Sequence, residues 1–246
     1  MALAHPVSLN GQAVLVTGGA SGLGAALCDQ LAHRGARVMV ADLQEQAAQA
    51  KAKQLVAMGF AAEALACDVS DNEQATHAVR HTIDRFGSID VLVNNAGTDI
   101  TCGIAELEIA QWQRVLQTNL HGPFVMAREA ARHMMGHGHG QIVNVTSTAA
   151  KRQWPNASAY HASKTGLLAL SHALHAELRP AGIKVTAVIA GGMLTPFLLD
   201  RFPDIDRSTL QDPANVALAI CDVLELPAAT AVPEITILPM RESSWP

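Results

Sequence analysis

The chain has 246 residues, 49% of them hydrophobic and 16% charged, which is enough apolar material for one large domain or two small ones. Its formal net charge of −5 argues against a surface that binds nucleic acid or an anionic membrane. No apolar run approaches the roughly 20 residues that span a bilayer, and residues 1–10 lack the pattern of a signal peptide. We therefore expect a cytoplasmic protein that works without a membrane.

Short apolar runs alternate with longer amphipathic segments along the whole chain. We predict strands at 13–16, 38–41, 64–67, 90–93, 142–145, 185–189 and 234–238, and helices near 22–34, 44–58, 72–86, 104–136, 157–179 and 213–225. Continuous apolar strands that alternate with helices are typical of a parallel sheet covered on both faces. The sequence therefore predicts an α/β protein with a doubly wound parallel sheet, a Rossmann fold. Residues 1–246 are expected to form one domain, because no linker-like stretch divides them.

A glycine-rich turn, Thr17–Gly24, joins the first predicted strand to the first predicted helix. Gly18, Gly22 and Gly24 allow a tight turn, a close approach of the backbone to a ligand, and close packing of helix on strand. The start of the helix presents free N–H groups and the positive end of its dipole to a pyrophosphate. A glycine cluster can be no more than a turn, but the strand–turn–helix context favours nucleotide binding.

Asp42 ends the second predicted strand, 18 residues after Gly24. A carboxylate at this place accepts hydrogen bonds from the adenosine ribose and repels a 2′-phosphate. Its neighbours Ser21 and Leu43 supply no cation to offset that repulsion, so NAD is favoured over NADP. Asp68, at the end of the third strand, is expected either to bond the adenine amino group or to cap the following helix.

Two features that resemble metal-ligand patterns are explained better without a metal. Alternating glycine and histidine over 136–140 is more typical of a solvated turn between a helix and a strand. The cysteines are scattered with no C-x-x-C spacing, so isolated buried thiols explain them better than disulfides or a metal site: Cys28, Cys67, Cys102 and Cys221.

Tyr160 and Lys164 lie four residues apart in a predicted helix, and therefore on one face of it. The pKa of a free tyrosine lies near 10, and a nearby positive charge lowers it. The pair is thus a candidate general acid and base for moving the proton of an alcohol or a carbonyl. Standing alone it is weak evidence, because a packed tyrosine beside a solvated lysine gives the same spacing by chance.

Several motifs in order make the chain resemble a short-chain dehydrogenase/reductase of the branch with about 250 residues. The resemblance covers residues 10–195 and, more loosely, the rest. It rests on Thr17-Gly18-x-x-x-Gly22-x-Gly24, Asn94-Asn95-Ala96-Gly97, Asn119, Ser147 thirteen residues before Tyr160, and Lys164.

The resemblance implies roles for four residues. Tyr160 is expected to be the general acid and base, and Lys164 to lower the pKa of Tyr160 and bind the nicotinamide ribose. Ser147 is expected to orient the substrate carbonyl, and Asn119 to hold a water in a proton relay. The competing local roles are a turn residue for Ser147 and a polar helix contact for Asn119.

The resemblance also implies a set of residues that contact the cofactor: Gly18, Ser21, Gly22, Leu23, Gly24, Asp42, Leu43, Asp68, Val69, Asn95, Ala96, Gly97, Tyr160, Lys164, Gly191, Met193 and Thr195. The chain departs from the family in two places. Ala190 and Gly191 stand where relatives carry Pro-Gly, so a looser turn near the nicotinamide is expected. The C-terminal tail from residue 235 lacks the usual glycine-rich end, which puts in doubt the contacts that relatives use in tetramers.

Three segments are expected to surround the substrate: 98–102, 149–156 and the apolar loop after Thr195. Trp154, Phe197, Leu198 and Phe202 indicate a mostly apolar pocket, and the shortness of the loop favours a compact secondary alcohol. Lys151 and Arg152 are candidates for binding an anionic substrate, although a solvated position is the simpler expectation. We expect His161 to have a structural role.

Three functions compete. The first is an NAD-dependent enzyme that interconverts a secondary alcohol and a ketone, with a small molecule as its partner. The second, an NADP-dependent 3-oxoacyl-carrier reductase, needs cations near Asp42 and a basic docking patch, and neither is evident. The third, a non-catalytic dinucleotide-binding sensor, predicts eroded catalytic residues, whereas the set is intact. By resemblance we also expect a homo-oligomer, a dimer or a tetramer, that pairs through helices 104–136 and 157–179.

Overall fold

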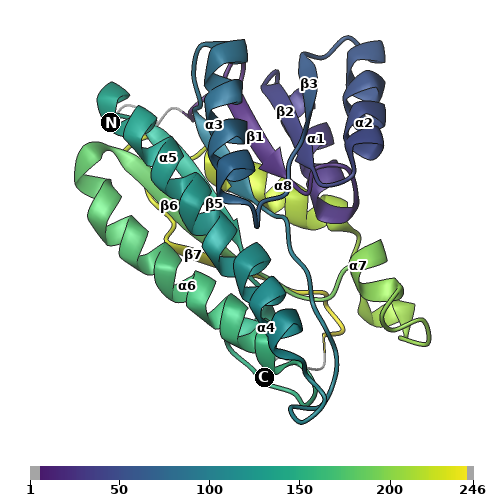
Figure 1. Cartoon of the computed structure of the whole chain (residues 1–246). Helices are drawn as coiled ribbons and strands as arrows, with labels where there is room; N and C mark the ends of the chain where they lie inside the picture. The colour runs from purple at the N-terminus through teal and green to yellow at the C-terminus, as the bar shows by residue number, and fades with distance from the viewer. Residues whose placement is uncertain (1–5, 243–246) are drawn as a thin grey trace.

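A parallel sheet forms the centre of the computed structural model, which describes residues 6–242 (Figure 1). Within these residues the strand order is β3-β2-β1-β4-β5-β6-β7. The strands are β1 (Ala13–Thr17), β2 (Arg37–Asp42), β3 (Ala62–Ala66), β4 (Val91–Asn94), β5 (Gly140–Val145), β6 (Ile183–Ala190) and β7 (Glu234–Ile237). All pair in parallel. This confirms the predicted doubly wound α/β fold.

The order of the strands reverses between β1 and β4. From β1 the chain moves outward through β2 and β3, then crosses back to β4 on the other side of β1. Helices that follow β1 and β4 therefore leave in opposite directions, and a crevice opens at the carboxyl ends of these strands. The glycine-rich turn after β1 and the asparagine motif after β4 meet at this point.

Helices cover both faces of the sheet, because the central strands β1, β4 and β5 are buried along their whole length. On one face lie α1 (Gly22–His33), α2 (Glu45–Ala57) and α8 (Pro213–Leu224), packed on a valine-rich core. On the other lie α3 (Asn72–Phe86), α5 (Gly122–His137) and α6 (Ser158–Leu178), which stand in front of the sheet in Figure 1. Among residues 6–242, no helix is long and apolar enough to cross a membrane.

The helix predicted over 104–136 begins later and is interrupted. Glu108 and Gln111 form a capping box, so the helix α4 (Ile109–Leu116) begins at Ile109. A π-helical turn, Gln117–His121, then separates it from α5. Such turns are frequent at functional sites, and this one carries Asn119.

The apolar segment after Thr195, expected as a loop, contains short helices. It forms α7 (Pro196–Leu199), which stands off from the sheet in Figure 1, and a 3-10 turn, Arg207–Thr209. Two further 3-10 turns, Thr148–Ala150 and Arg179–Ala181, flank α6. The strand predicted at 64–67 runs over Ala62–Ala66 because its register is set by pairing with β2.

Candidate active site

A cavity of about 820 Å³ lies at the carboxyl ends of the strands, where the order reverses. Its walls come from the glycine-rich turn, the ends of β2 to β6, and the segment around α7. The predicted catalytic residues Ser147, Tyr160 and Lys164 all line it. So do these predicted cofactor residues: Gly18, Ser21, Gly22, Leu23, Asp42, Leu43, Asp68, Val69, Asn95, Ala96, Gly97, Gly191, Met193 and Thr195.

Gly24 is the one predicted cofactor residue that does not line the cavity within the described chain. A Cβ at this position would lie 2.0 Å from the carbonyl oxygen of Gly18. The absence of a side chain therefore lets α1 pack against the turn. Gly24 thus supports the turn that lines the cavity and does not line the cavity itself. Gly18 and Gly22 adopt positive φ values of 60° and 51°, which glycine reaches at low cost.

The asparagine motif after β4 fixes the shape of the glycine-rich turn. The side-chain amide of Asn95 donates to the carbonyl oxygens of Thr17 at 2.9 Å and Gly18 at 3.1 Å. In return the Thr17 hydroxyl accepts from the backbone N–H groups of Asn95 and Ala96, at 3.0 and 3.1 Å. These bonds fix the shape of the turn where Gly18, Ser21 and Gly22 line the cavity, so the residues present fit a dinucleotide.

Asp42 lines the cavity, and its carboxylate can accept further hydrogen bonds. One oxygen accepts from the N–H of Ala20 and the other from that of Gln44, both at 3.0 Å. Each oxygen keeps a lone pair for a ribose hydroxyl. The alternative role considered for Asp68, capping a helix, belongs instead to Asp71, which accepts from the N–H groups of Glu73 and Gln74 at the start of α3.

Tyr160 and Lys164 lie on α6 with both side chains buried at the cavity. Lys164 Nζ donates to the carbonyl oxygen of Val145 at 2.9 Å and lies 5.7 Å from the centroid of the Tyr160 ring. Ser147, at the end of β5, accepts from the N–H of Ala149 at 3.1 Å and hydrogen-bonds to Tyr160. The three groups therefore converge on one point of the wall.

Burial dominates the acidity of both groups in the protein alone. It raises the pKa of Tyr160 to about 12, and the hydrogen bond with Ser147 opposes this only in part. Burial also lowers the pKa of Lys164 to about 8. The sequence predicts a lowered pKa for Tyr160, and in the free protein the direction is the reverse, because loss of hydration outweighs the charges nearby.

Asn119 is fully buried and does not line the cavity. Its side-chain oxygen accepts from the N–H of Thr98 at 2.8 Å, and its amide donates to the carbonyl oxygen of Thr98 at 2.7 Å and to the Ser163 hydroxyl at 3.0 Å. A Cβ on Gly97 would lie 3.5 Å from Asn119 Oδ1 and 3.6 Å from Lys164 Nζ. Asn119 thus fixes the segment beside Lys164. Both N–H donors of its side chain are taken, and Oδ1 keeps one lone pair for a water.

The turn after β6 is closely packed, although proline is missing before Gly191. A Cβ on Gly191 would lie 2.7 Å from Pro239, and Glu242 Oε2 accepts from the N–H of Gly192 at 3.3 Å. The C-terminal tail therefore covers this turn up to residue 242, and the expected looseness is not found. Residues 243–246 lie outside the described part.

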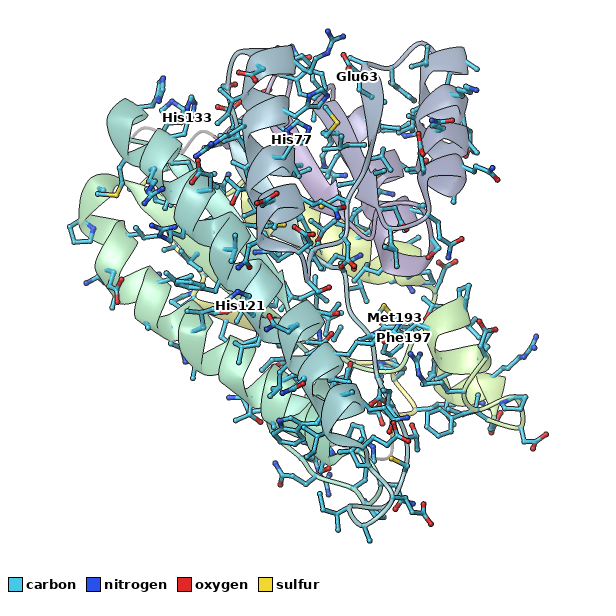
Figure 2. All side chains as sticks on the ribbon, viewed as in Figure 1. Glu63, His77, His121, His133, Met193 and Phe197 are labelled. Atoms are coloured by element: carbon cyan, nitrogen blue, oxygen red, sulfur yellow. The ribbon has the colours of Figure 1, made fainter. Side chains whose placement is uncertain are left out.

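The wall around α7 is less apolar than the sequence indicates. Four apolar side chains line the cavity as predicted: Trp154, Phe197, Leu198 and Phe202. Phe197 lies in the same segment as Met193 (Figure 2), which also lines the cavity. Asp99 and Arg201 line it as well, and neither was singled out from the sequence. The one available signal was spacing, since Phe197 and Arg201 are four residues apart, as on one helical face.

Lys151 and Arg152, the cations considered for an anionic substrate, do not line the cavity within the described chain. Lys151 pairs with Glu234 at 3.0 Å. His161 has the structural role expected: it accepts from the N–H of Trp154 at 3.1 Å, and its other ring nitrogen lies 2.9 Å from the carbonyl oxygen of Ala149. It thereby fixes the segment that carries Trp154.

Comparisons with known proteins agree on one family. A family model described as short chain dehydrogenase matches residues 12–206. D-threitol dehydrogenase of Mycolicibacterium smegmatis is 38% identical over 76% of this chain and 72% of its own.

Two solved structures resemble the fold over nearly its full length. One is 3-ketoacyl-(acyl-carrier-protein) reductase from Brucella melitensis complexed with NADH, which has a TM-score of 0.87 at 30% identity, covering 96% of this chain and 100% of that one. The other is a metagenomic short-chain oxidoreductase in complex with NADP, with a TM-score of 0.84 at 29% identity, covering 95% and 99%.

Proposed function

The chain belongs to the short-chain dehydrogenase family, and from this premise we propose that it interconverts a secondary alcohol and a ketone with NAD(H). One observation carries the proposal. Tyr160 and Ser147 line the same cavity as the glycine-rich turn and Asp42. A dinucleotide held at the turn thus reaches the groups that move the substrate proton.

The residues that would hold the cofactor follow from the site. The N–H groups at the start of α1, around Gly22, would hold the pyrophosphate, Asp42 would hold the adenosine ribose, and Lys164 the nicotinamide ribose. When bound, the nicotinamide supplies the acceptor or donor of a hydride.

Tyr160 moves the proton. During oxidation its phenolate takes the proton of the substrate hydroxyl while the hydride leaves the carbon, and during reduction the phenol returns that proton to the forming alkoxide. Ser147 donates a hydrogen bond that orients the same oxygen. Lys164, as a buried cation near the ring, favours the phenolate over the phenol.

We propose NAD in preference to NADP because of the charge at Asp42. Its carboxylate lines the cavity together with Ser21, Leu43 and Gln44, and none of these three brings a positive charge to meet a 2′-phosphate. The two ligand-bound relatives carry NADH in one case and NADP in the other, so Asp42 is the feature that supports the choice.

The resemblance to a ketoacyl reductase favours a second candidate, reduction of a 3-oxoacyl group on a carrier. That reaction would use the same catalytic residues, Ser147, Tyr160 and Lys164. It differs in that an acyl carrier protein docks at the mouth of the cavity. A panel of secondary alcohols and their ketones, together with a 3-oxoacyl thioester, separates the two when each is assayed with NAD and NADP by the absorbance of reduced nicotinamide. Turnover of small alcohols with NAD supports the first candidate. NAD binding without turnover of any of them would favour a dinucleotide-binding sensor.

We also propose a homo-oligomer that forms through α4, α5 and α6. These helices share a groove of about 370 Å³ lined mostly by apolar residues, among them Leu116, Leu120, Phe124 and Leu170. The side chain of Phe124 is 42% exposed. An apolar groove of this kind is explained by burial against a second copy of the chain.

A further inference from the structure

Asp99 and Arg201 lie at the substrate end of the cavity. The Asp99 carboxylate and the Arg201 guanidinium are not hydrogen-bonded to each other. Arg201 donates to the main-chain carbonyl oxygen of Asp99 at 3.3 Å and to that of Phe197. Its guanidinium carbon lies 4.1 Å from the centroid of the Phe197 ring. Arg201 is therefore held against the wall by backbone and ring, and other N–H groups of its fork stay available to a ligand.

The carboxylate of Asp99 has few donors around it. Its Oδ1 is fully buried and has no hydrogen-bond partner among the described residues, while Oδ2 accepts from the Thr101 hydroxyl at 3.4 Å. Burial raises the pKa of this carboxyl, and the backbone N–H of Ile100, which also acts on it, opposes that rise. Buried polar atoms in native proteins are nearly always paired with protein, water or ligand. Asp99 itself lines the cavity, so a small movement of this side chain would turn the unused acceptor capacity of its carboxylate toward a donor on the ligand.

Both charges lie close to the reacting groups. The Tyr160 and Phe197 rings are 6.0 Å apart between centroids, so Tyr160, Phe197 and Arg201 form a row along one wall. The charge of Asp99 raises the pKa of Tyr160 and that of Arg201 lowers it, which places both within electrostatic reach of the phenol. A substrate oxygen at Tyr160 thus has Asp99 and Arg201 within the span of a small molecule.

We propose that Asp99 determines specificity by accepting a hydrogen bond from a second hydroxyl of the substrate, so that the enzyme selects neutral vicinal diols and polyols over monohydric alcohols. Arg201 donates to a further oxygen and balances the charge of Asp99, which makes a neutral substrate a better fit than an anion. A monohydric alcohol leaves the Asp99 oxygen unpaired, and sites built to bond a hydroxyl reject analogues that lack it. The proposal rests on the proposed dehydrogenase function.

The test compares meso-2,3-butanediol with 2-butanol, which differ by one hydroxyl. With NAD saturating, kcat/KM of each is measured for the natural enzyme, Asp99→Leu and Asp99→Asn. We expect the natural enzyme to prefer the diol, and Asp99→Leu to lower kcat/KM for the diol by about 10- to 100-fold, the loss of a hydrogen bond to a charged group. The ratio of the two kcat/KM values is the readout, because 2-butanol never made that bond. Loss of the Asp99 charge also changes the pKa of Tyr160, but this change acts on both substrates and leaves their ratio unaffected.

Two variants control the experiment. Asp204→Leu removes a carboxylate from an exposed position shortly after Arg201 and keeps the diol preference. Asp99→Asn keeps an acceptor oxygen and most of the shape, so it retains more of the diol preference than Asp99→Leu does. This second comparison stays informative if thermal melting shows that the leucine variant does not fold.

Binding separates the failure of this proposal from failure of the proposed function. Calorimetry measures diol binding to the Tyr160→Phe protein with NAD, with and without Asp99→Leu. Diol binding that depends on Asp99, without turnover by the natural enzyme, supports the diol site and overturns the dehydrogenase. Turnover of both alcohols with equal kcat/KM, or an equal loss for both in Asp99→Leu, overturns the diol site alone.

Discussion

Lys164 Nζ lies 5.7 Å from the centroid of the Tyr160 ring, and its hydrogen bond to the carbonyl oxygen of Val145 holds it there. The two side chains come from one face of α6, one turn apart, so the helix sets their spacing. The anchor on β5 then fixes the cation relative to the sheet. Both groups are buried, and their opposite responses to burial govern how the site behaves with pH.

Tyr160→Phe removes the hydroxyl that moves the proton and keeps the ring on Phe197. We expect kcat to fall by about 100- to 10,000-fold, the range for losing a general acid or base. NAD binding, measured by fluorescence titration, stays nearly unchanged because the glycine-rich turn and Asp42 are intact. Turnover close to that of the natural enzyme would remove Tyr160 from the mechanism.

Asp42→Ala removes the carboxylate that meets the adenosine ribose. We expect the ratio of kcat/KM with NAD to that with NADP to fall by about tenfold, equivalent to about 1.4 kcal/mol. The loss combines a missing acceptor for NAD with relief of repulsion for NADP. The matched control is Asp71→Ala, which removes a carboxylate that caps α3 and does not line the cavity within the described chain. An unchanged ratio in Asp42→Ala removes this residue from cofactor choice.

Gly24→Ala tests the packing beneath the glycine-rich turn. Its Cβ would lie 2.0 Å from the carbonyl oxygen of Gly18, so the turn or α1 must move. We expect a loss of about 1 to 3 kcal/mol in the free energy of unfolding, typical of overpacking, together with weaker NAD binding. Gly136→Ala is the control, because nothing lies within 4 Å of a Cβ there and alanine favours the helix. Equal melting temperatures for the two variants would contradict the packing argument.

Much of this site could be predicted from the sequence, because the motifs that identify it are formed by residues close together in the chain. The glycine-rich turn, Asn95 and the spacing of Tyr160 and Lys164 each depend on neighbours within a few residues or on strand ends that meet at one edge. Asp99 and Arg201 lie in two segments expected around the substrate, but neither was singled out, because their pairing depends on long-range placement. Asp99 and Arg201 are 102 residues apart, and only the folding of α7 over the strand ends brings them together.

Burial explains the other differences. Gly24 belongs to a motif that predicts ligand contact, yet its lack of a side chain serves the packing of α1 on the turn. The spacing of Tyr160 and Lys164 predicts a lower pKa for the phenol, yet spacing carries no information about the loss of water around both groups. Asn119 was predicted from a motif position, and the partners of its amide, Thr98 and Ser163, are set by the tertiary fold.

Phe124→Glu tests the groove shared by α4, α5 and α6. A charge buried in an apolar contact between two copies is costly, so we expect the oligomer to dissociate toward monomers. The mass is measured by light scattering after gel filtration. Met135→Glu places the same charge on α5 at a side chain that is 55% exposed and does not line the groove within the described chain, and it leaves the mass unchanged. Equal masses for all three proteins would rule out this interface.

Lys164→Met links the site to stability. Burial lowers the pKa of Lys164 from 10.5 to about 8, so below pH 8 the folded protein carries a buried charge that the unfolded chain hydrates freely. Above the unfolded pKa of Lys164, 10.5, the lysine is neutral in both states and its burial costs nothing. The folded protein loses this advantage as the pH falls through about 8, where the buried lysine becomes charged. We therefore expect Lys164→Met to be inactive, and at pH 7 to have a free energy of unfolding about 1 to 3 kcal/mol above that of the natural protein.

The comparison is made by denaturant unfolding without cofactor between pH 7 and 10. The gain in Lys164→Met shrinks as pH rises from about 8 toward 10, because the natural lysine then loses its charge in the folded state first. Tyr160 acts in the opposite sense and at higher pH, since its pKa is raised from 10.0 to about 12 and its stabilising contribution is lost as pH rises through that range. Lys51→Met is the control: this largely buried lysine is paired with Asp29 at 2.6 Å, so its removal lowers stability at pH 7. A loss of stability at pH 7 in Lys164→Met as well would show that the bond to Val145 outweighs the cost of burying the charge.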